Sequence, residues 1–100
     1  MTELETEIED KLMGMVKRHG GLCLKWVCPG GAGVPDRIIL LPEGHIIFCE
    51  LKRPKGGKLA LLQKWWRKRL QNFGFLSVVI KNVKEVEQLE QVIIDLTGRR

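Results

Sequence analysis

Two carboxylates and one lysine are the residues best suited to chemistry. Asp36 follows Pro35 at the start of one apolar segment, and Glu50 and Lys52 lie at the end of the next. Side chains alternate between the two faces of a strand, so Glu50 and Lys52 project to the same face. If residues 42–44 turn the chain back on itself, position 36 lies opposite position 50. The spacing predicts that two acids and one base meet at one end of a hairpin.

Such a trio suits hydrolysis of a phosphodiester bond. Carboxylate oxygens bind Mg²⁺ or Mn²⁺, and these metals keep several water ligands. The metal polarises a phosphoryl oxygen and lowers the pKa of a bound water. A lysine beside it can orient or deprotonate the attacking water, or offset charge in the transition state. On spacing alone, a surface ion pair between Lys52 and the two acids is the more frequent explanation of this pattern.

Seven predicted elements position these residues. Apolar residues at helical or strand spacing, and turns rich in glycine and proline, mark their boundaries. The predicted elements are helix 3–19, strands 22–27, 37–41 and 45–51, helix 61–73, strand 76–80 and helix 83–96. This αβββαβα order predicts an α/β fold in which helices flank a mixed sheet. The length of 100 residues suits a single domain, 1–100.

Positive charge is unevenly distributed along the chain. The sequence has 17 Lys and Arg against 12 Asp and Glu, a net charge of +5. Between Glu50 and Glu85 there is no acid, and ten cations occur there: Lys52, Arg53, Lys55, Lys58, Lys64, Arg67, Lys68, Arg69, Lys81 and Lys84. A long basic segment favours a polyanionic partner such as nucleic acid, although a basic surface can also serve solubility alone.

Several other classes of protein are disfavoured. No apolar stretch is long enough to cross a bilayer, so no membrane partner is expected. The acidic N-terminus does not resemble a signal peptide, and the cysteines (Cys23, Cys28 and Cys49) lack zinc-binding spacing. Both observations indicate a reducing, intracellular setting. The glycine-rich residues 29–34 lack the P-loop pattern, so no nucleotide cofactor is expected.

The motifs resemble those of the VRR-NUC (virus-type replication-repair nuclease) branch of the PD-(D/E)XK nucleases. The resemblance rests on Gly33-Val-Pro-Asp36, on Glu50-Leu-Lys52 after thirteen intervening residues, on residues 25–30 (KWVCPG) and on Leu62-Gln63. It implies a restriction-endonuclease-like fold and a metal-dependent DNA endonuclease. Stand-alone members of the family resemble Holliday-junction resolvases. This implies a homodimer that acts on branched DNA such as four-way junctions, in the cytoplasm, including that of a phage-infected bacterium.

The resemblance also implies which residues form the catalytic centre. Asp36, Glu50 and the backbone carbonyl of Leu51 look like the ligands of Mg²⁺ or Mn²⁺. Lys52 matches the catalytic lysine of the motif.

Two further roles follow from the same resemblance. Gln63 matches a helix glutamine that reaches into such sites, although it could equally be a helix-surface residue. Glu7 resembles a first-helix glutamate that assists metal binding, and Glu5 and Glu9 compete for that role. Any of the three glutamates could instead stabilise the amino end of the helix dipole.

Cations near the predicted site are candidate contacts for the DNA backbone. They are Lys25, Arg37, Arg53, Lys55 and Lys58. Trp65 and Trp66 could stack on unpaired bases, or pack in the core or in a dimer interface. The alternative function is a nucleic-acid-binding module without catalysis, or a nuclease subunit whose specificity comes from a partner.

Overall fold

The computed structural model describes residues 5–52 and 59–98, and the predicted order of helices and strands is confirmed. The elements are α1 (Glu5–Arg18), β1 (Leu22–Lys25), β2 (Arg37–Leu41), β3 (His45–Leu51), α2 (Leu61–Asn72), β4 (Leu76–Ile80) and α3 (Val83–Thr97). A short 3₁₀ turn, Pro42–Gly44, joins β2 to β3. The strand predicted at 22–27 ends two residues earlier, at Lys25.

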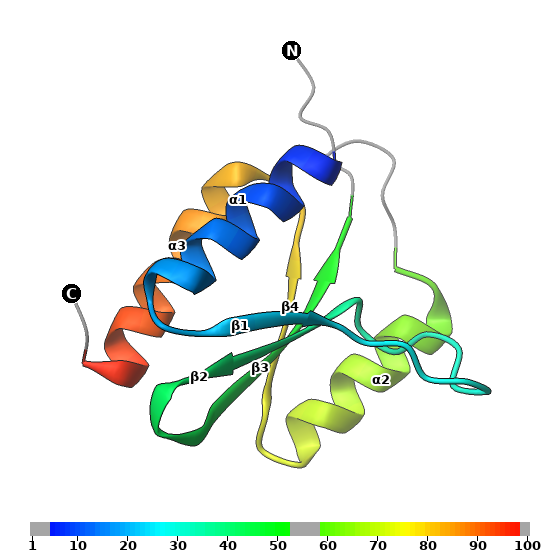
Figure 1. Cartoon of the computed structure of the whole chain (residues 1–100). Coiled ribbons are helices and arrows are strands. Elements are labelled where there is room, and N and C mark those ends of the chain that lie inside the picture. Colours follow the sequence, from blue (N-terminus) through cyan, green and yellow to red (C-terminus); the bar gives the residue numbers. More distant parts are fainter. Residues whose placement is uncertain (1–4, 53–58, 99–100) are drawn as a thin grey trace.

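The strands form one mixed sheet in the order β1-β2-β3-β4. The first two pairs are antiparallel, and β3 and β4 are parallel. Helices α1 and α3 lie side by side on one face of this sheet, and α2 covers the other (Figure 1). The α/β prediction is therefore confirmed. A parallel pair needs a crossover connection, which α2 provides between β3 and β4.

Strand alternation divides the interior into two layers. Ile47, Cys49 and Leu51 of β3 belong to the main core, which α1 and α3 complete with Ile8, Leu12, Val86 and Ile93 among others. Phe48 points to the opposite face, where its ring lies 5.3 Å from those of Trp26 and Phe75. Within residues 5–52 and 59–98, no helix has the length and hydropathy needed to span a membrane.

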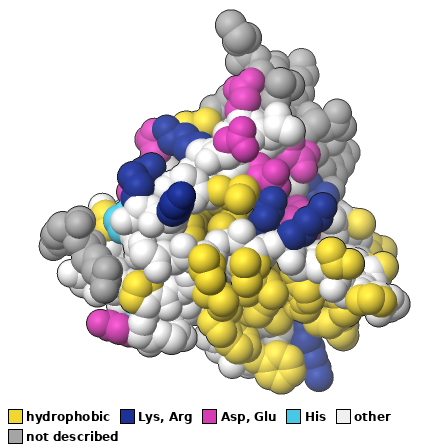
Figure 2. Space-filling model, in the orientation of Figure 1, with side chains coloured by type: hydrophobic (Ala, Val, Ile, Leu, Met, Phe, Trp, Pro, Cys, Tyr) yellow, Lys and Arg dark blue, Asp and Glu magenta, His cyan; other side chains and the backbone are white. Residues whose placement is uncertain are grey.

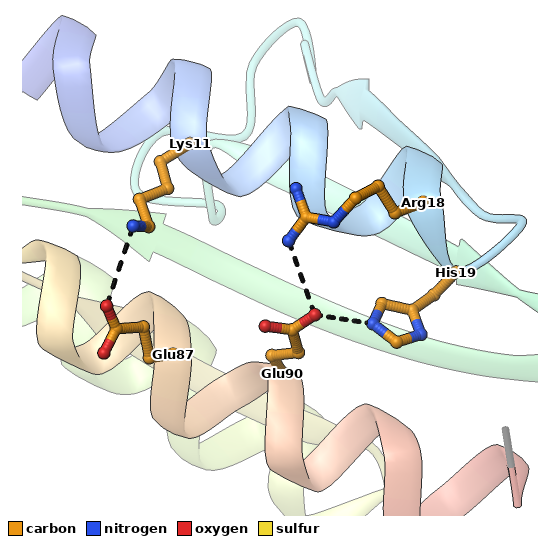
Figure 3. Close-up of polar contacts among 5 residues, drawn as sticks. All are labelled: Lys11, Arg18, His19, Glu87 and Glu90. Carbon is orange, nitrogen blue, oxygen red and sulfur yellow. Dashed lines mark hydrogen bonds and ion pairs between the residues drawn. The ribbon is translucent and has the colours of Figure 1, made fainter. Parts of the chain in front are cut away.

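Polar contacts join α1 to α3 above the main core (Figure 3). The ring of His19, which is buried, donates from Nε2 to Oε2 of Glu90 over 2.7 Å. Arg18 reaches the same oxygen at 3.4 Å, and Lys11 lies 3.6 Å from Glu87. The hydrogen bond from His19 is the main reason why the pKa of Glu90 is lowered. These contacts fix the position of α1, whose amino end lies towards the predicted site.

The outer edge of the sheet at β4 is partly covered by side chains of α2. The carbonyl of Ser77 accepts from Nε of Arg67 at 3.1 Å and from Nε2 of Gln71 at 3.0 Å. Ile80 uses its own carbonyl on the β3 side, where it accepts from the backbone N–H of Lys52. The Ser77 carbonyl therefore faces away from β3, on the edge where the described residues form no further strand.

Candidate active site

The hairpin of β2 and β3 brings Asp36 and Glu50 together. Arg37 pairs with Cys49 in the ladder, so the next position along each strand places Asp36 opposite Glu50. The backbone N–H of Leu51 donates to Oδ2 of Asp36 at 2.9 Å. On its other side, the carbonyl of Asp36 accepts from the N–H of Trp26, also at 2.9 Å. Strands on both sides therefore fix the backbone and the carboxylate of this aspartate.

Glu50 is a buried acid, with only 6% of its surface exposed. Burial, a hydrogen bond with Asp36 and the charge of that carboxylate raise the pKa of Glu50 to about 8. The ammonium of Lys52 acts in the opposite direction and favours the ionised form. With its pKa raised in this way, Glu50 holds a proton at neutral pH. Displacing that proton would leave two carboxylates with one cation beside them.

Lys52 follows the last residue of β3, yet its backbone remains part of the sheet. Its N–H donates to the carbonyl of Ile80 at 3.0 Å. Its side chain is partly buried, and its charge acts on Glu50. Asp36, Glu50 and Lys52 are thus grouped at one end of the hairpin, as the spacing suggested. We refer to these three residues as the hairpin triad.

The donor set fits a hard divalent cation. In the described part of the chain, no group of three or more His, Cys, Asp or Glu side chains could hold a metal. A metal held by the two carboxylates would therefore take its other ligands from water and main-chain oxygen, which Mg²⁺ and Mn²⁺ accept readily. The N–H and C=O of a strand residue point to the same side. Since the N–H of Leu51 points to Asp36, its carbonyl lies on the side where a third ligand is needed.

Among the first-helix acids, Glu5 is the one whose charge acts on Glu50. Glu9 forms an ion pair with Arg37, in which Oε2 of Glu9 lies 2.9 Å from Nη2 of Arg37. Glu7 is exposed and has no hydrogen bond or ion pair with another described residue. Its assignment as a metal-assisting residue stays a prediction. Glu5 acts on Glu50 through its charge, although it does not form a metal-holding group with Asp36 and Glu50. The signal that sequence reasoning missed is helical spacing: Glu5 begins the stripe that continues, three and seven positions on, through the buried Ile8 and Leu12.

Gln63 has a local role in the structure. Its Oε1 accepts from the backbone N–H of Ala60 at 2.9 Å, which caps the first turn of α2. This side chain is therefore used at the helix terminus, and its predicted catalytic role remains a prediction.

The candidate DNA contacts fall into three groups. Arg53, Lys55 and Lys58 lie outside the described residues. Lys25 is exposed at the end of β1. Arg37 points to the α1 face, where it pairs with Glu9 and donates to the carbonyl of Cys23, so the structure does not bring it to the hairpin triad.

The loop before Asp36 is packed tightly against α2. Nε1 of Trp66 donates to the carbonyl of Ala32 at 3.1 Å. Gly33 has a positive φ of 88°, and a Cβ there would lie 2.8 Å from Cγ of Leu62 and 3.0 Å from its backbone carbon. Both the φ angle and the close approach require glycine at this position. Helix α2 thereby holds the chain that leads into Asp36.

Gly33→Ala is expected to lower the free energy of unfolding by about 2–4 kcal/mol, because it combines backbone strain with overpacking. Gly30→Ala is a matched control. Gly30 has a similar φ of 76°, but a Cβ there would meet nothing within 4 Å. We expect this control to cost about 1–2 kcal/mol from strain alone. Urea unfolding followed by tryptophan fluorescence measures both values, and equal losses would mean that Leu62 moves aside without cost.

Comparison with known proteins agrees with the nuclease motif formed by Asp36, Glu50 and Lys52. No family model matches the chain. A phage protein named "Putative nuclease p44", from Acyrthosiphon pisum secondary endosymbiont phage 1, is 50% identical over 50 residues. The match spans 50% of this chain and 54% of that protein, so the chain matches about half of its relative's length.

Two solved structures share the fold. One, described as a VRR_NUC domain, superposes with a TM-score of 0.82 at 28% identity and covers 87% of this chain and 94% of its own. The second, a VRR_NUC domain protein, has a TM-score of 0.74 at 22% identity, covers 96% and 92%, and shows the fold alone. Together with the hairpin triad, the likeness to the first of these structures and to the phage protein supports a VRR-NUC domain.

Proposed function

We propose that this chain is a metal-dependent endonuclease that hydrolyses phosphodiester bonds in DNA. One observation carries the proposal: Glu50 is buried opposite Asp36, whose carboxylate raises the pKa of Glu50, while the charge of Lys52 lowers it. A surface ion pair would leave these carboxylates in water with ordinary pKa values. Burial of Glu50 opposite a second carboxylate is costly unless a cation joins the two, so the arrangement is suited to binding one.

Each residue has a distinct task in this reaction. Asp36, Glu50 and the carbonyl of Leu51 would hold Mg²⁺ or Mn²⁺. When bound, such a metal supplies Lewis acidity to a phosphoryl oxygen and to a water. Lys52 orients the attacking water or offsets the charge that develops on the phosphate. The N–H of Leu51 keeps the Asp36 carboxylate in position, and burial keeps Glu50 from turning into solvent.

The preferred substrate is branched DNA, such as a four-way junction, and the active form is a homodimer. A chain of 100 residues covers few phosphates, and a two-fold dimer would present two hairpin triads to a symmetric junction. The similarity to a phage protein named as a nuclease supports the choice of nucleic acid as the substrate.

A cleavage assay tests the proposal. A four-way junction and a linear duplex of the same sequence are incubated with the chain in Mg²⁺, in Mn²⁺ and in EDTA. We expect strand cleavage only with metal, and faster cleavage of the junction. Binding without cleavage under every metal condition would instead identify a nucleic-acid-binding module. Sedimentation of the chain with and without the junction measures the expected dimer.

A further inference from the structure

The side of α2 that faces away from the sheet carries apolar and basic side chains together. Positions spaced by four, seven, eight and eleven residues share one helix face, so five residues align there. We define the α2 outer face by these residues: Leu61, Trp65, Lys68, Arg69 and Asn72. Leu61 is 85% exposed and Trp65 is 53% exposed. These two side chains are one helical turn apart, and neighbouring exposed apolar side chains rimmed by polar residues form a candidate interaction site.

Trp65 lies between two hollows in the surface. One, of about 410 Å³, is lined by Leu61, Leu62 and Trp65. The other, of about 130 Å³, is lined by Trp65, Lys68, Arg69 and Asn72. Figure 2 shows apolar side chains gathered in the lower part of the molecule, where α2 lies. One ring therefore separates an apolar hollow from a cationic one.

The ring of Trp65 is supported from within the fold. It stands perpendicular to Trp66 at a centroid distance of 5.2 Å. Trp66 is itself held by its hydrogen bond to Ala32 and by an edge contact with Trp26 at 6.0 Å. Trp26 in turn contacts the buried Phe48. A supported ring loses little conformational freedom on binding, which favours affinity for a flat ligand.

We propose that the α2 outer face binds unpaired DNA. A base stacks on Trp65 and fills the apolar hollow, and a neighbouring phosphate contacts Lys68 and Arg69. Aromatic rings flanked by cations bind single strands without sequence preference, because every base has a flat face and every linkage a charge. The inference rests on the proposed function and refines it: the substrate would carry a single-stranded segment beside the duplex to be cut.

Charge argues against a second copy of the chain as the occupant. The α2 outer face has two cations, Lys68 and Arg69, and helix α2 contains no acid. A two-fold contact places the same patch of both copies together, so these cations would face one another. Like charges across an interface are repulsive, whereas a polyanion neutralises them. The positive charge of the α2 outer face is thus complementary to DNA and not to the same face of a second copy.

The position of the face fits a strand that leads to the hairpin triad. Leu62, which lines the apolar hollow, packs against Gly33, three residues before Asp36. The loop that ends at Asp36 therefore adjoins the hollow directly. A base bound on Trp65 would lie at the side of the molecule from which this loop enters the site.

Binding of oligodeoxythymidine in EDTA tests the inference without cleavage. For Trp65→Ala we expect the dissociation constant to rise about five- to 100-fold. Trp65→Phe should stay within about threefold of the native chain, because phenylalanine also stacks. Lys68→Gln should reduce the slope of affinity against salt concentration by about 0.7, the loss of one phosphate contact. Lys17→Gln, an exposed lysine of α1, serves as its control and should leave the slope unchanged.

Three results would overturn the inference. Unchanged oligonucleotide binding in Trp65→Ala, with a native melting temperature, removes Trp65 from the DNA surface. If Trp65→Ala loses self-association but still binds the oligonucleotide, the α2 outer face is a contact with a second copy of the chain. If Trp65→Ala weakens binding of a duplex of equal length as much as it weakens binding of the single strand, Trp65 does not recognise unpaired bases. None of these depends on cleavage, so failure of the nuclease proposal is seen separately, in the metal-dependent assay.

Discussion

Replacing Lys52 with methionine is expected to lower the rate of metal-dependent DNA cleavage by about 10²–10⁴-fold, the usual contribution of an acid–base or charge-stabilising group. Methionine keeps most of the length and the apolar stem of lysine but removes the ammonium. The variant loses the charge that acts on Glu50 and that, in the proposed reaction, would act on the phosphate. Single-turnover cleavage of a four-way junction at saturating metal measures the effect.

Lys81→Met is the matched control for this variant. Lys81 is exposed just after β4, within the same acid-free segment of the chain. Its replacement should change the cleavage rate by less than about threefold, since a single exposed charge contributes little. If both variants cleave alike, Lys52 has no catalytic role. Binding of the junction in EDTA should be similar for both, because each removes one positive charge.

The second large effect is a gain in stability. In EDTA at about pH 9, Glu50→Gln is expected to raise the free energy of unfolding by about 2–4 kcal/mol. The pKa of Glu50 is about 8 in the folded chain, above the ordinary value of 4.5 that it regains on unfolding. Between these values the folded state holds a proton that the unfolded state has released. Stability of the native chain therefore falls as the pH rises through this interval, and a neutral glutamine removes that loss.

Urea unfolding at several pH values measures this gain, which should disappear towards pH 4.5 because both side chains are then neutral. The matched control is Glu87→Gln, an exposed acid of α3 that lies 3.6 Å from Lys11 and should show little pH dependence. Loss of stability in Glu50→Gln at about pH 9 would contradict the raised pKa. The same variant should lose metal-dependent cleavage, so stability and activity would change in opposite directions.

The hairpin could be predicted from the sequence because local rules determine it. The turn at Pro42–Gly44 fixes the pairing of β2 with β3, and alternation then decides which side chains share a face. Asp36 lies opposite Glu50 for this reason alone. Alternation also places Arg37, one residue after Asp36, on the other face, although its partner Glu9 depends on the docking of α1.

The remaining features depend on tertiary packing that periodicity does not encode. Three glutamates of the first helix are similar in sequence, and only the rotation of α1 on the sheet brings Glu5 towards Glu50. Trp65 and Trp66 are adjacent and chemically identical. Their different exposure follows from the loop at Ala32, which accepts a hydrogen bond from Trp66. The capping role of Gln63 is local, but a capping box begun by alanine lacks the usual serine or threonine signal.

The covered carbonyl of Ser77 has a consequence for assembly. Arg67 and Gln71 occupy the hydrogen-bonding position that an incoming strand would need on the β4 side. Association of copies through the β4 edge would therefore first have to displace both side chains from this carbonyl.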